Sequence, residues 1–193
     1  MEKKTEDRSP ANRAVITGCG SFVPSKILTN EDLARTVDTS DEWINSRTGI
    51  KTRHITSDEE STAYLATEAA KRALQYAGLG AEDLDLITVA TITPEMVFPS
   101  TACFVQQALG AKKAWAFDIG AACSGFVYSL HLVHQFIENG RIDNALVIGA
   151  ETLTKITNWK DRTSCILFGD GAGAVVLQRK QDAGRGILYS TVG

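Results

Sequence analysis

The sequence lacks the features that mark membrane, secreted and metal-binding proteins. No apolar run approaches the roughly 20 residues that a membrane-spanning helix needs, and residues 1–12 are polar with charges of both signs, unlike a secretory signal. The four cysteines include no C-x-x-C pair, which argues against a zinc site and against a disulfide framework. Free thiols suit a reducing compartment. We therefore expect a cytoplasmic protein whose residues 1–12 form a disordered tail.

An excess of charge of one sign is also missing. The formal net charge is −3, so neither nucleic acid nor an anionic membrane is expected as a partner. Hydrophobic residues make up 44% of the chain and charged residues 22%, as in ordinary globular proteins. A chain of 193 residues is long enough for one sizeable core.

Strand-like and helix-like segments alternate along most of the chain. Strands are expected at residues 14–23, 85–91, 114–119 and 144–149, and helices at residues 30–37, 40–47, 61–78, 100–109 and 123–139. This alternation predicts an α/β protein in which helices cover both faces of a parallel sheet. Functional residues of such proteins lie at the carboxyl ends of the strands.

Short-range signals refine these boundaries. Asn30 is the expected cap of the first helix, and Thr39 with Glu42 has the spacing of a capping box for the second. Glycines in the first strand predict that another element packs closely against its backbone. The glycines of residues 169–173 resemble a phosphate loop, but the strand-like run that follows favours a tight structural turn.

Cys123 is the candidate nucleophile. It follows the strand at 114–119, precedes a helix, and has small residues on both sides. A helix N-terminus favours the thiolate, which is the nucleophilic form, and the backbone N–H of Cys123 could face an oxyanion. The alternative is a buried cysteine that acts as a small apolar side chain, which is how Cys19, Cys103 and Cys165 are interpreted.

Trp43 and Arg47 form a candidate nucleotide-binding pair. Their spacing of four residues places both on one helix face, where an indole ring and a guanidinium could hold an adenine with nearby phosphates. The alternative is a tryptophan packed beneath a surface arginine.

No base for Cys123 is evident in the sequence. His131, His134 and Glu138 share one side of the helix after Cys123, where they could bind a metal but more commonly serve as surface or interface groups. Eight helical residues place His131 about 12 Å from Cys123 along the axis, beyond hydrogen-bond reach. The remaining histidine, His54, has no evident link to Cys123.

Four stretches occur together in an order typical of one enzyme family. They are residues 38–44 (DTSDEWI), 47–50 (RTGI), 121–126 (AACSGF) and 168–174 (FGDGAGA). Together they resemble β-ketoacyl-acyl-carrier-protein synthase III, a thiolase-like condensing enzyme that initiates bacterial fatty-acid synthesis. The resemblance runs from about residue 13 to residue 193 and covers the first half of such an enzyme.

The resemblance implies a fold and its boundaries. Residues 13–180 would form the N-terminal half of a two-half thiolase-like fold, layered α/β/α around a five-stranded, mostly parallel mixed sheet. Residues 181–193 would be the first strand of the C-terminal half. The rest of that half, which carries a histidine and an asparagine of the active site, matches nothing in this sequence.

The resemblance also implies an activity. Cys123 would accept the acyl group of acetyl-coenzyme A or another short acyl-coenzyme A, and condensation with malonyl-acyl-carrier protein would follow. Trp43, Arg47, Thr39 and Arg162 would hold coenzyme A, and Phe98 would reach into the acyl pocket of a partner in a homodimer. No metal and no cofactor other than the coenzyme A substrate is implied.

Two alternatives remain open at this point. One is a non-catalytic half-module that binds coenzyme A or dimerises. The other is a related condensing enzyme of the polyketide or long-chain type, although the Trp43 and Arg47 stretch favours the initiating synthase.

Overall fold

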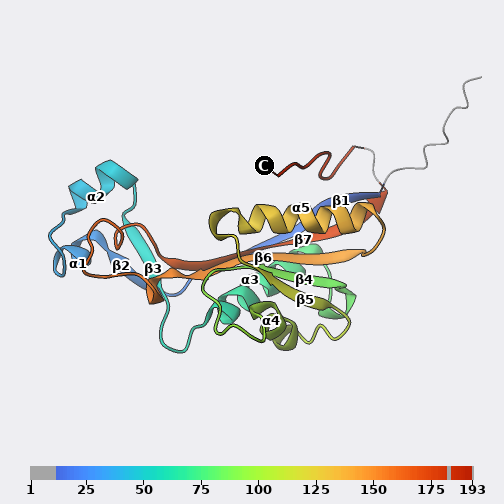
Figure 1. Ribbon diagram of the computed structural model, residues 1–193, viewed down its shortest axis with the longest axis horizontal. Coiled ribbons are helices and arrows are strands. Elements are labelled where there is room, and N and C mark those ends of the chain that lie inside the picture. Colours follow the sequence, from blue (N-terminus) through green and yellow to red (C-terminus); the bar gives the residue numbers. More distant parts are fainter. Residues whose placement is uncertain (1–11, 182–183, 193) are drawn as a thin grey trace, which may run out of the picture.

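A five-stranded mixed sheet forms the centre of the computed structural model, which describes residues 12–181 and 184–192 (Figure 1). The strand order is β1-β7-β6-β4-β5. The strands are β1 (Asn12–Phe22), β4 (Leu86–Ala90), β5 (Trp115–Ile119), β6 (Asn144–Thr152) and β7 (Asp170–Gln181). The tail predicted for residues 1–12 lies outside the described residues except for Asn12, which begins β1.

Parallel and antiparallel pairings are equally frequent in this sheet. β4 pairs in parallel with β5 and β6, whereas β7 pairs antiparallel with β6 and with β1. The expected mixed, mostly parallel sheet is confirmed, because β1, β4, β5 and β6 run in one direction and β7 alone among the described strands of this sheet runs against them. Helices return the chain to the same edge between β4, β5 and β6, which gives parallel neighbours, while a loop reverses its direction between β6 and β7.

Helices cover both faces of the sheet, as predicted. Helices α3 (Thr62–Ala77) and α4 (Thr101–Leu109) lie on one face, and α5 (Gly125–Glu138) lies on the other (Figure 1). Four alanines of α3 are fully buried in the core beneath the sheet: Ala66, Ala69, Ala70 and Ala73. A Cβ atom at Gly18 or Gly20 of β1 would overlap the α3 backbone at Ala73 or Ala69. The strand glycines therefore permit a close helix, which confirms the expectation for β1.

A small extension stands at one end of the main sheet (Figure 1). It contains the antiparallel strands β2 (Lys26–Thr29) and β3 (Thr52–Ile55), with helices α1 (Asn30–Ala34) and α2 (Asp41–Thr48) between them. Its own core consists of Leu33, Ile44, Cys165 and Ile166, with Trp43 packed against it. Residues from the loop between β6 and β7 thus complete the extension.

Both helix caps in the extension differ from the prediction by one residue. Thr29, not Asn30, caps α1 and forms a capping box with Asp32. Ser40, not Thr39, caps α2 by accepting a hydrogen bond from the Trp43 N–H at 3.1 Å. Thr29 and Ser40 have the extended backbone that aims a side-chain oxygen at the helix N–H groups.

Two predictions for the C-terminal region are also corrected. The glycines at 171 and 173 lie within β7, where they pair with Glu151 and Gly149 of β6, so they do not form a turn. Among the described residues up to 181 and from 184 to 192, no helix follows them, which agrees with the rejection of a phosphate loop. Residues 184–192 form no strand; the Ile187 N–H donates to the Ala14 carbonyl of β1, and Ser190 contacts the side chains of α5.

Three short 3₁₀ helices complete the regular structure of the described residues: η1 (Ala81–Asp83), η2 (Ala122–Ser124) and η3 (Leu153–Lys155). None of the helices in residues 12–181 and 184–192 is long and apolar enough to cross a membrane.

Candidate active site

Cys123 lies at the predicted strand-to-helix turn. β5 ends at Ile119, η2 carries Cys123, and α5 begins at Gly125. Ala122 has a φ of 45°, and it alone among the described non-glycine residues has a positive φ. This left-handed conformation is disfavoured for a residue with a Cβ atom. Cys123 is exposed, so the interpretation of it as a buried apolar side chain is wrong. The same interpretation is confirmed for Cys165, which is buried, but it is wrong for Cys19, which is exposed, and Cys103 is only partly buried.

Close packing seats the first turn of α5 on the sheet. A Cβ atom at Gly125 would lie 3.1 Å from that of Ala90 at the end of β4. The Phe126 ring covers Gly149 of β6 at 3.4 Å from the position of a Cβ atom there. These contacts hold the helix N-terminus at the carboxyl ends of β4 and β6, where the topology predicts a functional site.

Two carboxylates that sequence reasoning missed brace the loops beside this turn. Glu151 of β6 accepts hydrogen bonds from the Ile92 N–H at 2.9 Å and from the hydroxyls of Thr91 and Thr93. Asp118 of β5 accepts the N–H groups of Thr101 and Ala102 at 2.7 and 2.8 Å, at the N-terminus of α4. The signal in the sequence that could have identified both residues is an acidic side chain within an otherwise apolar strand.

Two opposing effects of its surroundings act on the pKa of the Asp118 carboxyl group. Burial raises the pKa of this carboxyl, and the hydrogen bonds from the backbone of Ala102 and Thr101 oppose that rise without cancelling it. Asp118 anchors one end of the loop at residues 92–100, which presents Phe98 at 84% exposure. Met96 and Val97 of the same loop are also exposed.

Trp43, Arg47 and Arg162 come together in the extension. The guanidinium carbon of Arg47 lies 4.4 Å from the centroid of the Trp43 ring, and that of Arg162 lies 4.9 Å from it. Arg162 also donates to the Asp38 carbonyl at 2.9 Å and lies 3.5 Å from the Asp38 carboxylate. Thr39 lies next to Asp38 in the chain, and its buried hydroxyl has no hydrogen-bond partner among the described residues.

The histidines on α5 bind the segment that ends the described chain. The Nδ1 atoms of His131 and His134 each lie 2.9 Å from the Ser190 hydroxyl. His134 Nε2 lies 3.1 Å from Glu138, without the alignment of a hydrogen bond, and Glu138 pairs with Arg13 of β1 at 3.0 Å. Within the described ranges, no three or more potential ligand residues are placed to hold a metal ion.

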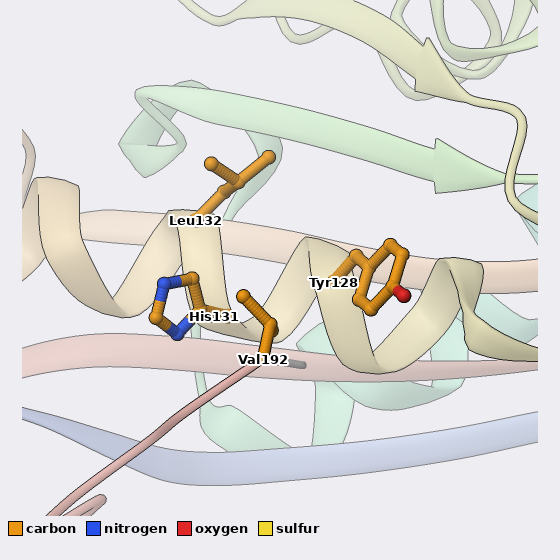
Figure 2. Close-up of a pocket in the computed structure, with 4 residues that line it drawn as sticks. All are labelled: Tyr128, His131, Leu132 and Val192. Carbon is orange, nitrogen blue, oxygen red and sulfur yellow. The ribbon is translucent and has the colours of Figure 1, made fainter.

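The histidine cluster does not contact Cys123. Figure 2 shows Tyr128, His131 and Leu132 along α5 with Val192 beside them, around a hollow of about 340 Å³. His54 is occupied elsewhere, since its Nδ1 lies 2.6 Å from the Pro24 carbonyl oxygen. None of the three histidines therefore has a contact to Cys123 in the described part of the chain.

Known proteins match the chain in sequence and in structure. The family model for 3-oxoacyl-(acyl-carrier-protein) synthase III matches residues 117–193. The β-ketoacyl-acyl-carrier-protein synthase III of Caldanaerobacter subterraneus is 61% identical over 180 residues, which are 93% of this chain and 54% of that protein. The Rhodospirillum centenum protein of the same name is 56% identical and covers 91% of this chain and 55% of its own length.

Solved structures give the same result. The 3-oxoacyl-(acyl-carrier-protein) synthase III of Aquifex aeolicus superposes with a TM-score of 0.86 at 56% identity, over 88% of this chain and 55% of that one. The priming β-ketosynthase of the R1128 polyketide pathway superposes with a TM-score of 0.86 at 34% identity, over 91% of this chain and 53% of that one. The chain thus spans about half the length of the relatives that it matches, and it belongs to the β-ketoacyl-acyl-carrier-protein synthase III family of thiolase-like condensing enzymes.

Proposed function

We propose that this chain provides the acyl-accepting half of a cytoplasmic synthase that initiates fatty-acid synthesis. The substrates are acetyl-coenzyme A, or another short acyl-coenzyme A, and malonyl-acyl-carrier protein, and the product is a 3-oxoacyl-carrier protein. Residues 13–180 form the N-terminal half, and residues 181–193 begin the second. The observation that carries this proposal is the exposed Cys123 on its tight turn at the N-terminus of α5.

The first chemical step belongs to Cys123. Its thiolate attacks the thioester carbonyl, a bond forms between the cysteine sulfur and the acyl carbon, and coenzyme A leaves as its thiolate. Cys123 lies just before the first turn of α5, where the positive end of the helix dipole attracts negative charge that develops in the reaction. The backbone N–H of Cys123 is the donor that we assign to the oxyanion of the tetrahedral intermediate.

The second step extends the acyl group. Malonyl-acyl-carrier protein loses carbon dioxide, and the resulting carbanion attacks the acyl carbon while the Cys123 thiolate leaves. By the family resemblance, a histidine and an asparagine of the other half support this step. No histidine of the described chain contacts Cys123, which is consistent with that assignment.

Coenzyme A binds, in this proposal, at the extension. Trp43 stacks on the adenine, Arg47 and Arg162 contact the phosphates, and Thr39 supplies its unpaired hydroxyl. Phe98 acts at the homodimer interface, where its exposed ring reaches the acyl pocket of the partner. No cofactor beyond the coenzyme A substrate is required.

A non-catalytic half-module is the second candidate. The apolar side of α5, where Val127, Tyr128 and Leu132 are exposed, fits a dimerising module as well as a half-enzyme that lacks its second half. Exposed apolar surfaces of this kind mark association sites. Light scattering separates the candidates in part, because a half-enzyme is expected to associate, and a monodisperse monomer would count against it.

The test of the first step is an intact mass spectrum after brief exposure to acetyl-coenzyme A. We expect the protein to gain one acetyl group and the Cys123→Ser variant to gain none. Cys19→Ser is the matched control, because Cys19 is also exposed but lies in β1. Acetylation that persists in Cys123→Ser would refute Cys123 as the acyl acceptor, as would acetylation lost in Cys19→Ser alone.

A further inference from the structure

Two guanidinium groups cover the ring that is proposed to bind adenine. The guanidinium carbons of Arg47 and Arg162 lie 4.4 and 4.9 Å from the centroid of the Trp43 ring. A base stacked between an indole and a guanidinium needs two van der Waals contact distances, or roughly 7 Å in total. The present separation of Arg162 from Trp43 leaves no room for a base between them.

The two arginines are held in different ways. Arg47 lies on the same helix as Trp43 and makes only a long contact of 3.4 Å to the Trp43 carbonyl. Arg162 belongs to the loop after η3, and Asp38 holds it through a carbonyl at 2.9 Å and a carboxylate at 3.5 Å. Among the described ion pairs, Asp38 is the partner of Arg162, and Arg47 has none.

A ligand can readily replace the Asp38 carboxylate as the partner of Arg162. Its side chain is fully exposed, and the Arg162 side chain is 45% exposed. Such surface ion pairs contribute little stability and are screened by salt. A phosphate offers the guanidinium a more highly charged acceptor than one carboxylate, with the matched geometry of a forked hydrogen-bond pair.

We infer that Asp38 is a positioning residue that holds Arg162 over Trp43 in the ligand-free protein, so that a nucleotide must displace this arginine before its base can stack. The inference rests on the proposed binding of coenzyme A at this site. The apparent affinity is the affinity of the open form reduced by the fraction of molecules that are open. Asp38 therefore favours ligands that combine a base with phosphates, since the phosphates replace the acceptor that Arg162 loses when it moves away from Asp38.

The first test needs no ligand. In a Trp115→Phe/Trp159→Phe background, acrylamide quenching of fluorescence reports the accessibility of Trp43 alone. Asp38→Asn should raise the quenching constant. Arg162→Ala should raise it further and set the upper limit, because in Asp38→Asn the backbone carbonyl of residue 38 can still accept a hydrogen bond from Arg162. Asp58→Asn is the matched control, since Asp58 is an exposed aspartate outside the cluster. Equal quenching in the Asp38→Asn and Asp58→Asn variants would overturn the inference.

The second test measures binding of coenzyme A by titration calorimetry. Asp38→Asn should lower the Kd two- to ten-fold, whereas the Kd for pantetheine, which lacks the nucleotide, should not change. A higher Kd for coenzyme A in Asp38→Asn would overturn the inference, because it would mean that Asp38 prepares the site. Increased quenching in a protein that binds no coenzyme A would instead support the role of Asp38 and refute the proposed nucleotide site.

Should the double tryptophan background fail to fold, as judged by circular dichroism, the comparison is made by fluorine NMR of 5-fluorotryptophan protein. Trp43→Phe identifies the Trp43 signal, and its solvent isotope shift should increase in Asp38→Asn. An unchanged shift would again overturn the inference.

Discussion

Gly20 determines how closely α3 approaches β1. A Cβ atom there would overlap the backbone at Ala69 and Ala73, which cannot move without shifting the whole helix. We expect Gly20→Ala to lower the free energy of unfolding by about 1–3 kcal/mol, as overpacking in cores typically does. Urea denaturation followed by circular dichroism measures the change.

Gly173→Ala is the control for this prediction. Gly173 lies in β7 with no atom within 4 Å of a Cβ position, so the substitution should change stability by less than about 0.5 kcal/mol. Equal losses in the two variants would show that strand glycines matter here through backbone conformation and not through the close contact with α3.

At the scale of secondary-structure elements, Asp85 connects the amino ends of three strands. Its carboxylate accepts the N–H groups of Asp143 and Asn144 at 2.8 and 3.1 Å, before and at the start of β6, and lies 2.6 Å from the Lys113 ammonium, before β5. Burial alone would raise the pKa of Asp85, but the Lys113 contact and the two backbone N–H groups outweigh it and lower the pKa.

A pH dependence follows from this lowered pKa. The folded state binds the proton of Asp85 less tightly than the unfolded state, so its contribution to stability is present above the ordinary aspartate pKa of about 4 and is lost as the pH falls through the lower, folded-state value. We expect wild-type protein to be about 1 kcal/mol more stable than Asp85→Asn at pH 7. This advantage should shrink below about pH 4.

Thermal unfolding between pH 3 and pH 7 provides the measurement, with Asp58→Asn as the exposed control. An Asp85→Asn variant whose deficit stays constant down to pH 3 would contradict the assigned protonation. A deficit that grows toward acid would reverse the direction of the pKa shift.

The whole molecule is expected to perform one of the two proposed chemical steps. Cys123 and its helix N-terminus are present in the 193-residue chain, but no described histidine contacts the thiol. We therefore expect the isolated chain, given acetyl-coenzyme A and malonyl-acyl-carrier protein, to form the acetyl-cysteine and no 3-oxoacyl product. Mass spectrometry of the protein and of the carrier protein reads both steps, and a 3-oxoacyl-carrier protein made by this chain alone would refute the expectation.

Sequence reasoning identified most elements of this molecule because their signals are short in range. The helix that follows Cys123, the helix that carries Trp43, and the order of strands and helices follow from hydrophobic periodicity and small residues at turns. Helix caps were misplaced by one residue where neighbouring residues, such as Thr29 and Asn30, can both cap. The local backbone conformation, which the sequence pattern does not specify, decides between them.

Only the tertiary structure shows which distant parts of the chain contact one another. The exposure of Cys123, the antiparallel insertion of β7 between β1 and β6, the placement of Arg162 and Asp38 beside Trp43, and the binding of Ser190 by two histidines could not be derived from spacing. The sequence alone determined where a nucleophile and a stacking ring could form, since each depends on neighbours within a few residues. Their surroundings depend on which surfaces of the folded chain meet, and local patterns do not encode that.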